Sequence, residues 1–179
     1  MSDLIVYKYD SEEKAAEVLA EIAQLKQENV QKALIGIEDA AVAVKKADGK
    51  VKVQQTLESA VKGSRIMGGG FWGLLIGLLF GGPLIGALVG IGIYALLGRK
   101  IDIGIDNAFI DKLSDEMEAG NSALFLLTVN TPIETVTEAF SKHGGEVFHT
   151  SFTQEMADVM EQASQHEDLK DAVEAHNED

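Results

Sequence analysis

The sequence predicts an α+β fold that is interrupted by one long apolar insertion, and three observations predict it. Strand patterns alternate with amphipathic helical patterns on both sides of the insertion. The insertion, from Ile66 to Gly98, contains no charged residue and lies between Arg65 and Arg99. The rest of the chain carries all of the charged residues, and their excess of acidic side chains gives the protein a net charge of −14 at pH 7. Such an apolar segment must enter a membrane or be buried against other copies of the chain.

Before the insertion, the residues predict a strand, a helix and a hairpin. Apolar spacing and turn residues place them as a strand over Leu4–Tyr9, a helix from Asp10 or Ser11 to about Lys26, and a β-hairpin around Ala47-Asp48-Gly49. Residues 1–65 are nearly neutral, with 10 basic and 11 acidic side chains.

After the insertion, five further elements are predicted. They are a helix capped by Asp106 that runs to about Glu118, a buried strand over Ala123–Val129, a helix that begins in the capping box Thr131-Pro132-Ile133-Glu134 and ends near Lys142, a strand over Glu146–Thr150, and an amphipathic helix from near Thr153. Residues 99–179 carry 5 basic and 18 acidic side chains. We expect this acidic surface to be solvated and to repel nucleic acid.

The first six elements match a ferredoxin-like sandwich, with the helix from Asp106 to about Glu118 as its second helix. The remaining helix, strand and helix form a C-terminal αβα extension. We therefore expect four segments: 1–62 as the first part of the α/β domain, 63–100 as the apolar insertion, 101–152 as the second part of the domain, and 153–179 as an acidic helix and tail.

The insertion is predicted to be a hairpin of two short transmembrane or re-entrant helices. A single helix over these residues would be about 50 Å long at about 1.5 Å per residue, whereas the hydrocarbon core needs only about 20 residues. Gly81-Gly82-Pro83 lies near the middle, and proline breaks a helix interior. We expect helices over roughly Ile66–Gly81 and Pro83–Gly98, and either a shallow span or a dip into the bilayer is compatible with their length.

Basic and aromatic residues at the ends of the insertion predict its orientation. A hairpin places Lys62, Arg65, Arg99 and Lys100 on one side, which the positive-inside tendency makes cytoplasmic. Each predicted helix also carries one interfacial aromatic residue equally far from Pro83. The expected interfacial anchors are Arg65, Trp72, Tyr94, Arg99 and Lys100.

Glycines recur every four residues along the insertion and form a glycine zipper. The first row is Gly69, Gly73, Gly77 and Gly81, and the second is Gly82, Gly86 and Gly90. Small residues at this spacing make a flat helix face that lets another backbone approach closely. Two alternatives are open: the rows pack neighbouring subunits together, or they pack the two arms of one hairpin together.

The sequence contains no constellation that indicates catalysis, a cofactor or a metal. There is no cysteine, and none of the four histidines has the spacing of a metal motif. Residues 68–73 match GxGxxG and 90–95 match GxGxxA, but both lie inside the apolar insertion rather than between a strand and a helix. We therefore expect a protein that is not an enzyme and that binds neither cofactor nor metal.

Four blocks of the sequence resemble a known family. They are Gly49-Lys50-Val51, the glycine-rich hairpin, Asp102-Ile103-Gly104-Ile105-Asp106, and Gly120-Asn121-Ser122-Ala123-Leu124-Phe125. The resemblance covers nearly the whole chain and is to a widespread bacterial family of uncharacterised small membrane proteins, catalogued as a domain of unknown function. It implies an α/β domain with a hydrophobic hairpin and membrane association, and it transfers no catalytic residue.

The expected function is that of a non-enzymatic, membrane-associated homo-oligomer, acting as a scaffold or in membrane stress. Its expected partners are membrane lipid and other copies of itself, with the α/β domain in the cytoplasm. One alternative is a soluble ring or shell that buries the hairpins or holds lipid. Another, by analogy of fold alone, is a ligand-binding regulatory module.

Overall fold

The computed structural model describes residues 2–27, 36–57, 60, 70–81 and 105–153. Within them lie five strands and four α-helices, which confirms the α+β class. In chain order they are β1 (Ser2–Tyr9), α1 (Lys14–Gln27), β2 (Ile37–Lys45), β3 (Val51–Thr56), α3 (Gly70–Phe80), α5 (Asn107–Glu116), β4 (Ser122–Val129), α6 (Ile133–Phe140), the 3₁₀ turn η2 (Ser141–His143) and β5 (Glu146–Phe152).

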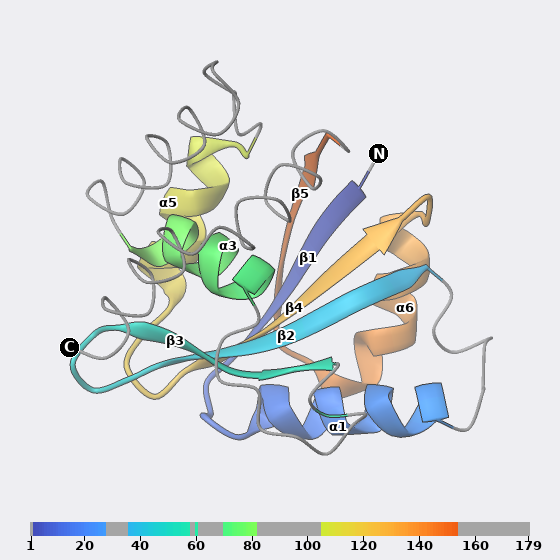
Figure 1. The fold of residues 1–179 in the computed structure, drawn as a ribbon, viewed down its shortest axis with the longest axis horizontal. Helices are drawn as coiled ribbons and strands as arrows, with labels where there is room; N and C mark the ends of the chain where they lie inside the picture. The colour runs from blue at the N-terminus through green and yellow to red at the C-terminus, as the bar shows by residue number, and fades with distance from the viewer. Residues whose placement is uncertain (1, 28–35, 58–59, 61–69, 82–104, 154–179) are drawn as a thin grey trace.

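The strands form one antiparallel sheet in the order β3-β2-β4-β1-β5 (Figure 1). β4 lies at its centre and pairs with both β1 and β2. Its sequence, SALFLLTV, is apolar on both faces of the strand, which confirms the predicted buried strand. The predicted hairpin is confirmed as β2 and β3, which pair antiparallel across the turn at Gly49.

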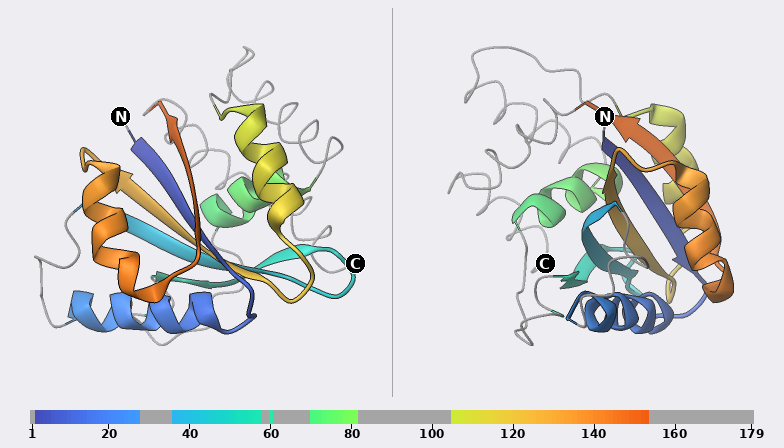
Figure 2. Two further views of the ribbon diagram at one scale, coloured as in Figure 1. Left: turned by 180° about the vertical axis from the view of Figure 1, so that it is seen from behind. Right: turned by 90° about the vertical axis from the view of Figure 1, so that its right-hand side faces the viewer.

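Helices cover both faces of the sheet (Figure 2). On one face, α1 and α6 pack against Ile5, Val42 and Leu124. On the other, α3 and α5 pack against Leu4, Ala41 and Phe125. We call these the α1/α6 face and the α3/α5 face. Alternate side chains of each strand serve the two faces, as the two-residue period of a strand requires.

The helix predicted from Asp106 to about Glu118 is present as α5, but its position differs from the prediction. Asp106 caps it as expected, and its carboxylate accepts a 2.9 Å hydrogen bond from the Ala108 amide. This helix is predicted to be the second helix of the sandwich, on the same face as the first, yet α5 packs on the face opposite α1. Helical periodicity identifies an apolar stripe but not the face of the sheet that covers it.

The capping box predicted at Thr131 does not form. Helix α6 begins at Ile133 with Pro132 as its N-cap, and no side chain caps it. The Thr131 hydroxyl instead donates to the Val129 carbonyl at 3.1 Å. Thr131 also lies against Gly36, where a Cβ atom would come within 1.6 Å of its Oγ1.

The predicted apolar hairpin is described only in part. Residues 70–80 of its first arm form α3, while the second arm lies outside the described residues. No helix in the described part of the chain has both the length and the apolarity to cross a bilayer. The described helix instead packs against the sheet, on the α3/α5 face.

Candidate functional site

Helix α3 is apolar on every side, unlike an ordinary surface helix. Its sequence, GFWGLLIGLLF, contains no charged or hydrogen-bonding side chain except the Trp72 indole. A helix at the surface of a soluble domain normally carries charged or polar residues on its outer face. Five side chains of α3 are buried: Trp72, Leu74, Leu75, Ile76 and Leu79.

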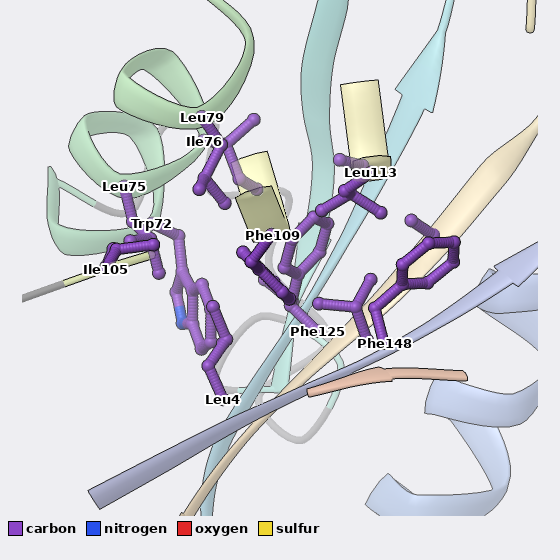
Figure 3. Packing of buried hydrophobic residues seen from close by; sticks show 14 of the residues in the cluster. Leu4, Trp72, Leu75, Ile76, Leu79, Ile105, Phe109, Leu113, Phe125 and Phe148 are labelled. Atoms are coloured by element: carbon purple, nitrogen blue, oxygen red, sulfur yellow. The ribbon is translucent and has the colours of Figure 1, made fainter. Parts of the chain in front are cut away.

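These side chains complete the core of the α3/α5 face (Figure 3). Phe125 of the central strand lies between two α3 rings, with its centroid 6.4 Å from that of Trp72 and 6.4 Å from that of Phe80. At roughly 1.5–3 kcal/mol for each buried side chain, docking of α3 contributes on the order of 10 kcal/mol. The sheet and α3 therefore form one folded unit.

One partly buried hydrogen bond links α3 to the sheet. The Trp72 indole, 2% exposed, donates from Nε1 to Asp39 Oδ2 at 2.9 Å. The other oxygen of that carboxylate accepts from the Ala40 amide at 2.8 Å. Asp39 lies at a register irregularity between β2 and β4. A charged acceptor makes the bond to the indole stronger than a neutral one would, and it fixes the rotation of α3 about its axis.

The α3/α5 face also carries larger partly exposed apolar side chains than the α1/α6 face. Those packed at the margin of its core are Val51, Val53, Phe71, Leu78, Phe80, Ile110 and Leu127. Those at the margin of the opposite core are Ala16, Ile37, Ala60 and Ile133. The chemistry available on the α3/α5 face is apolar contact, so we take this face as the candidate functional site.

A small groove lies on the other side of the sheet, between α1 and α6. Its volume is about 230 Å³, below the roughly 300 Å³ at which ligand pockets begin. At its rim, Glu21 accepts a hydrogen bond from Lys142, and its carboxylate lies 3.5 Å from His143 Nε2. The Lys142 bond lowers the pKa of Glu21, and burial lowers the pKa of His143. This ion cluster joins α1 to the end of α6 at the surface.

A second polar cluster joins β1 to β5. Asp3 Oδ1 accepts from Ser151 Oγ at 2.5 Å and lies 3.1 Å from His149 Nε2. The carboxylate therefore lies between the serine and the histidine, whereas a nucleophilic triad needs the histidine in the middle. The sequence did not indicate this cluster, because strand pairing brings together residues almost 150 positions apart.

Two buried tyrosine hydroxyl groups have no signal in the sequence. Tyr7 and Tyr9 lie on the α1/α6 face, 1% and 5% exposed. Neither hydroxyl has a hydrogen-bond partner among the described residues. Burial raises the pKa of both tyrosines to about 12. A sequence cannot reveal such groups, because burial of a hydroxyl depends on how the helices pack.

The structure describes four of the residues predicted to pack or anchor the insertion. Gly73 and Gly77 lie in α3 and Gly81 directly follows it, with Gly73 buried. Trp72, predicted at a membrane interface, is instead in the protein core, because its ring meets Phe125 and its N–H meets Asp39. The other predicted residues lie outside the described ranges: Gly69, Gly82, Gly86, Gly90, Arg65, Tyr94, Arg99 and Lys100.

Comparison with known proteins identifies the family. A family model described as a protein of unknown function, DUF1269, matches residues 66–165. The chain belongs to this family. The DUF1269 match begins at the first residue of the charge-free run and includes α3, α5, β4, α6 and β5. It confirms the predicted resemblance to an uncharacterised family. No curated protein and no solved structure matches the chain.

Proposed function

We propose that this DUF1269 protein is a non-enzymatic, membrane-associated homo-oligomer that attaches to lipid through the charge-free run. The observation that carries the proposal is the run itself: residues 66–98 contain no charge, and the described helix within it has apolar side chains all round. Apolar surface of this extent is typical of membrane or protein interaction sites. A scaffold or membrane-stress role fits such an attachment.

The flanking charges support a cytoplasmic position for the α/β domain. Lys62 and Arg65 precede the run, and Arg99 and Lys100 follow it. Basic residues near the ends of a membrane segment favour the cytoplasmic side.

The finer fold that we propose is a ferredoxin-like sheet made of β1-α1-β2 and β4-α6-β5, to which β3 adds an edge strand. The strand order supports this relationship.

For self-assembly, we propose that the glycine rows bring subunits together. Gly77→Leu and Gly86→Leu each add bulk to one row while keeping the run apolar. If a neighbouring helix packs on that row, each change disrupts or resizes the oligomer without releasing the protein from lipid. Unchanged particle size in both variants would assign the rows to packing within one chain.

A second candidate is a soluble oligomer in which the apolar runs are buried against protein. The packing of α3 on its own sheet favours this candidate, because protein alone buries Trp72 and Leu75, which are each 2% exposed. It differs from the first proposal only in what covers the remaining apolar surface.

Vesicle flotation followed by sizing separates the two candidates. The full-length protein is mixed with phosphatidylcholine vesicles, floated through a density gradient in 1 M salt, about where the Debye length falls to 3 Å, and then sized with and without detergent. We expect the protein to float with the vesicles and to need detergent for a uniform size. A protein that stays at the bottom and is uniform at high mass without detergent would establish the soluble oligomer instead.

A further inference from the structure

We infer that the outer edge of β5 pairs with the same edge of β5 in a second copy of the chain, so that two sheets join antiparallel about a two-fold axis. β5 and β3 are the edge strands of the sheet (Figure 1). An edge strand presents backbone N–H and C=O groups to which another strand can bind. The inference rests on the homo-oligomer of the proposed function and gives it a contact outside the charge-free run.

The other edge strand, β3, has two features that discourage such pairing. Gln54 is skipped in the pairing of β3 with β2, because the register shifts between Val42 and Ala43. An extra residue of this kind is a β-bulge, which bends the strand and disrupts its row of backbone groups. β3 also carries Lys52, and lysine is a residue with which natural proteins protect an edge strand.

β5 lacks both protective features. It pairs with β1 in continuous register over seven residues, from Glu146 to Phe152. Its sequence, EVFHTSF, contains no lysine, arginine or proline and is rich in β-branched and aromatic residues. Among the described residues, Val147 is the one large hydrophobic side chain that is exposed, at 40%. A strand added at this edge would cover Val147.

The charges near β5 favour a second copy as the partner. Residues 99–179 carry 5 basic and 18 acidic side chains, so two copies repel each other over most of this surface. From Val147 to Thr153, however, the chain contains no acidic residue. Glu146 is the first residue of β5, so a nearly complete antiparallel overlap places it opposite the neutral end of the partner strand. Two acidic chains can therefore meet along β5 without like charges opposite each other.

The direction of the side chains determines the register of the proposed pair. Directly opposite residues of an antiparallel pair point to the same face of the sheet. His149 pairs with Ile5 and therefore lies on the α1/α6 face, together with the alternate residues Val147 and Ser151. The two-fold axis must then pass through a residue, and all seven residues overlap only if that residue is His149. His149 would face its own copy, and Val147 would face Ser151 of the partner subunit.

Such a pair is closed and does not grow into a fibre. The contact uses the same edge of both copies, as a two-fold interface requires. The outer edges of the joined sheet are then the two β3 strands. Their bulge and lysine oppose the addition of a third copy.

The first test uses charge substitutions at His149, the position on the proposed axis. His149→Lys and His149→Glu each place like charges directly opposite each other, which destabilises a strand pair. We expect each full-length variant in non-ionic detergent to form a smaller particle than the unmodified chain in sedimentation velocity. When the two variants are co-expressed, lysine faces glutamate, and the original size should return.

The same charges at Gln54, on the bulged edge strand β3, are the matched control. Gln54→Lys and Gln54→Glu should keep the size of the unmodified chain, alone and co-expressed. Asp3 lies 3.1 Å from His149 Nε2, so circular dichroism checks that His149→Glu is folded. His149→Lys retains a cationic partner for Asp3, so its particle size is informative even if the glutamate variant unfolds.

The second test is cysteine cross-linking, which the cysteine-free chain permits. Directly opposite Cβ atoms are about 5 Å apart, so His149→Cys should cross-link to its own copy on oxidation. Val147 would lie about 13 Å from its own copy. Val147→Cys should therefore cross-link several-fold better in a mixture with Ser151→Cys than alone. Gln54→Cys measures the yield from random collision.

The outcomes separate this inference from the proposed function. Unchanged size in both His149 variants, no recovery on co-expression of the folded variants, or equal cross-linking at positions 149 and 54 overturns the edge contact. Protection of the β5 amides from hydrogen exchange in protein diluted to monomers also overturns it, because the chain itself then covers the edge. These results leave flotation with vesicles intact. A protein that is monomeric in detergent at every concentration removes the homo-oligomer and this inference together.

Discussion

The two faces of the sheet differ in the character of one helix, α3. On the α1/α6 face, the helices are amphipathic, and ion pairs such as Lys142–Glu21 and Lys14–Glu17 decorate their outer sides. On the α3/α5 face, α3 has no polar side to offer, and the Trp72–Asp39 hydrogen bond links it to the sheet. One sheet therefore carries two amphipathic helices on one face and, on the other face, an amphipathic helix beside a helix without a polar side.

The two faces also differ in the contacts that position their helices. Ser122 Oγ, fully buried, accepts from the Ala15 amide at the start of α1 and donates to the Ser11 carbonyl. Gly36 touches Thr131 just before α6. The α1/α6 face is thus positioned by backbone contacts at both helix starts, whereas α3 is positioned mainly by side-chain packing.

The largest expected effect comes from emptying the centre of the α3/α5 core. Phe125→Ala should lower the free energy of unfolding by about 3–5 kcal/mol through the cavity it leaves. Leu126 is equally buried but faces α1 and α6. Leu126→Ala should lower the free energy of unfolding by about 2–5 kcal/mol. Urea unfolding followed by circular dichroism measures both. Emission from Trp72 should shift to the red only in Phe125→Ala, and an equal shift in both variants would contradict the separation of the two cores.

A glycine pair tests the backbone contact on the α1/α6 side. Gly36→Ala combines left-handed strain, at φ +83°, with a collision against Thr131. The strain should lower the free energy of unfolding by about 1–2 kcal/mol, and the collision should lower it by about 1–3 kcal/mol more. Gly49→Ala has a similar φ of +84° but nothing within 4 Å, so about 1–2 kcal/mol is expected. Equal losses in thermal or urea unfolding would mean that the contact of Gly36 with Thr131 adds nothing.

The buried tyrosines make the α1/α6 face sensitive to alkali. Their pKa of about 12 in the folded chain exceeds the ordinary 10.0. Between these values the unfolded chain has lost protons that the folded chain keeps, so stability falls as pH rises from 10 to 12, by about 3 kcal/mol for each tyrosine. Tyr7→Phe should remove about half of this loss, and at pH 8 it should be neutral or stabilising by about 1 kcal/mol. Urea unfolding at pH 8 and at pH 11.5 measures both effects.

The smallest expected effect is at acidic pH on the same face. Burial lowers the pKa of His143 below its ordinary 6.5. The unfolded chain therefore binds a proton first, and this contribution to stability, complete above pH 6.5, declines as the pH falls below that value. His143→Asn should flatten the dependence of stability on pH just below 6.5. An unchanged slope would assign it to other groups.

The sequence predicted the parts of the fold that rest on local pattern. The nearly continuous apolar run of β4, the cap at Asp106 and the turn at Gly49 all have local signals, and the structure confirms each. What the sequence could not predict depends on tertiary packing. Trp72 was predicted at a membrane interface because α3 has no polar side, so its buried face has no periodicity, and because the carboxylate that its indole binds lies 33 positions away in the sequence.

The order of strands in the sheet also determines how long the apolar run lacks its packing partner during translation. β1 and β2 are not neighbours, and each pairs with β4. During synthesis, the charge-free run is complete at residue 98, before β4 at Ser122–Val129 exists. At about 5–20 residues per second, this interval lasts on the order of seconds. During that time Phe125 has not been synthesised, so α3 cannot pack on it. The most apolar segment of the nascent chain can therefore bind a membrane or a chaperone before the sheet forms.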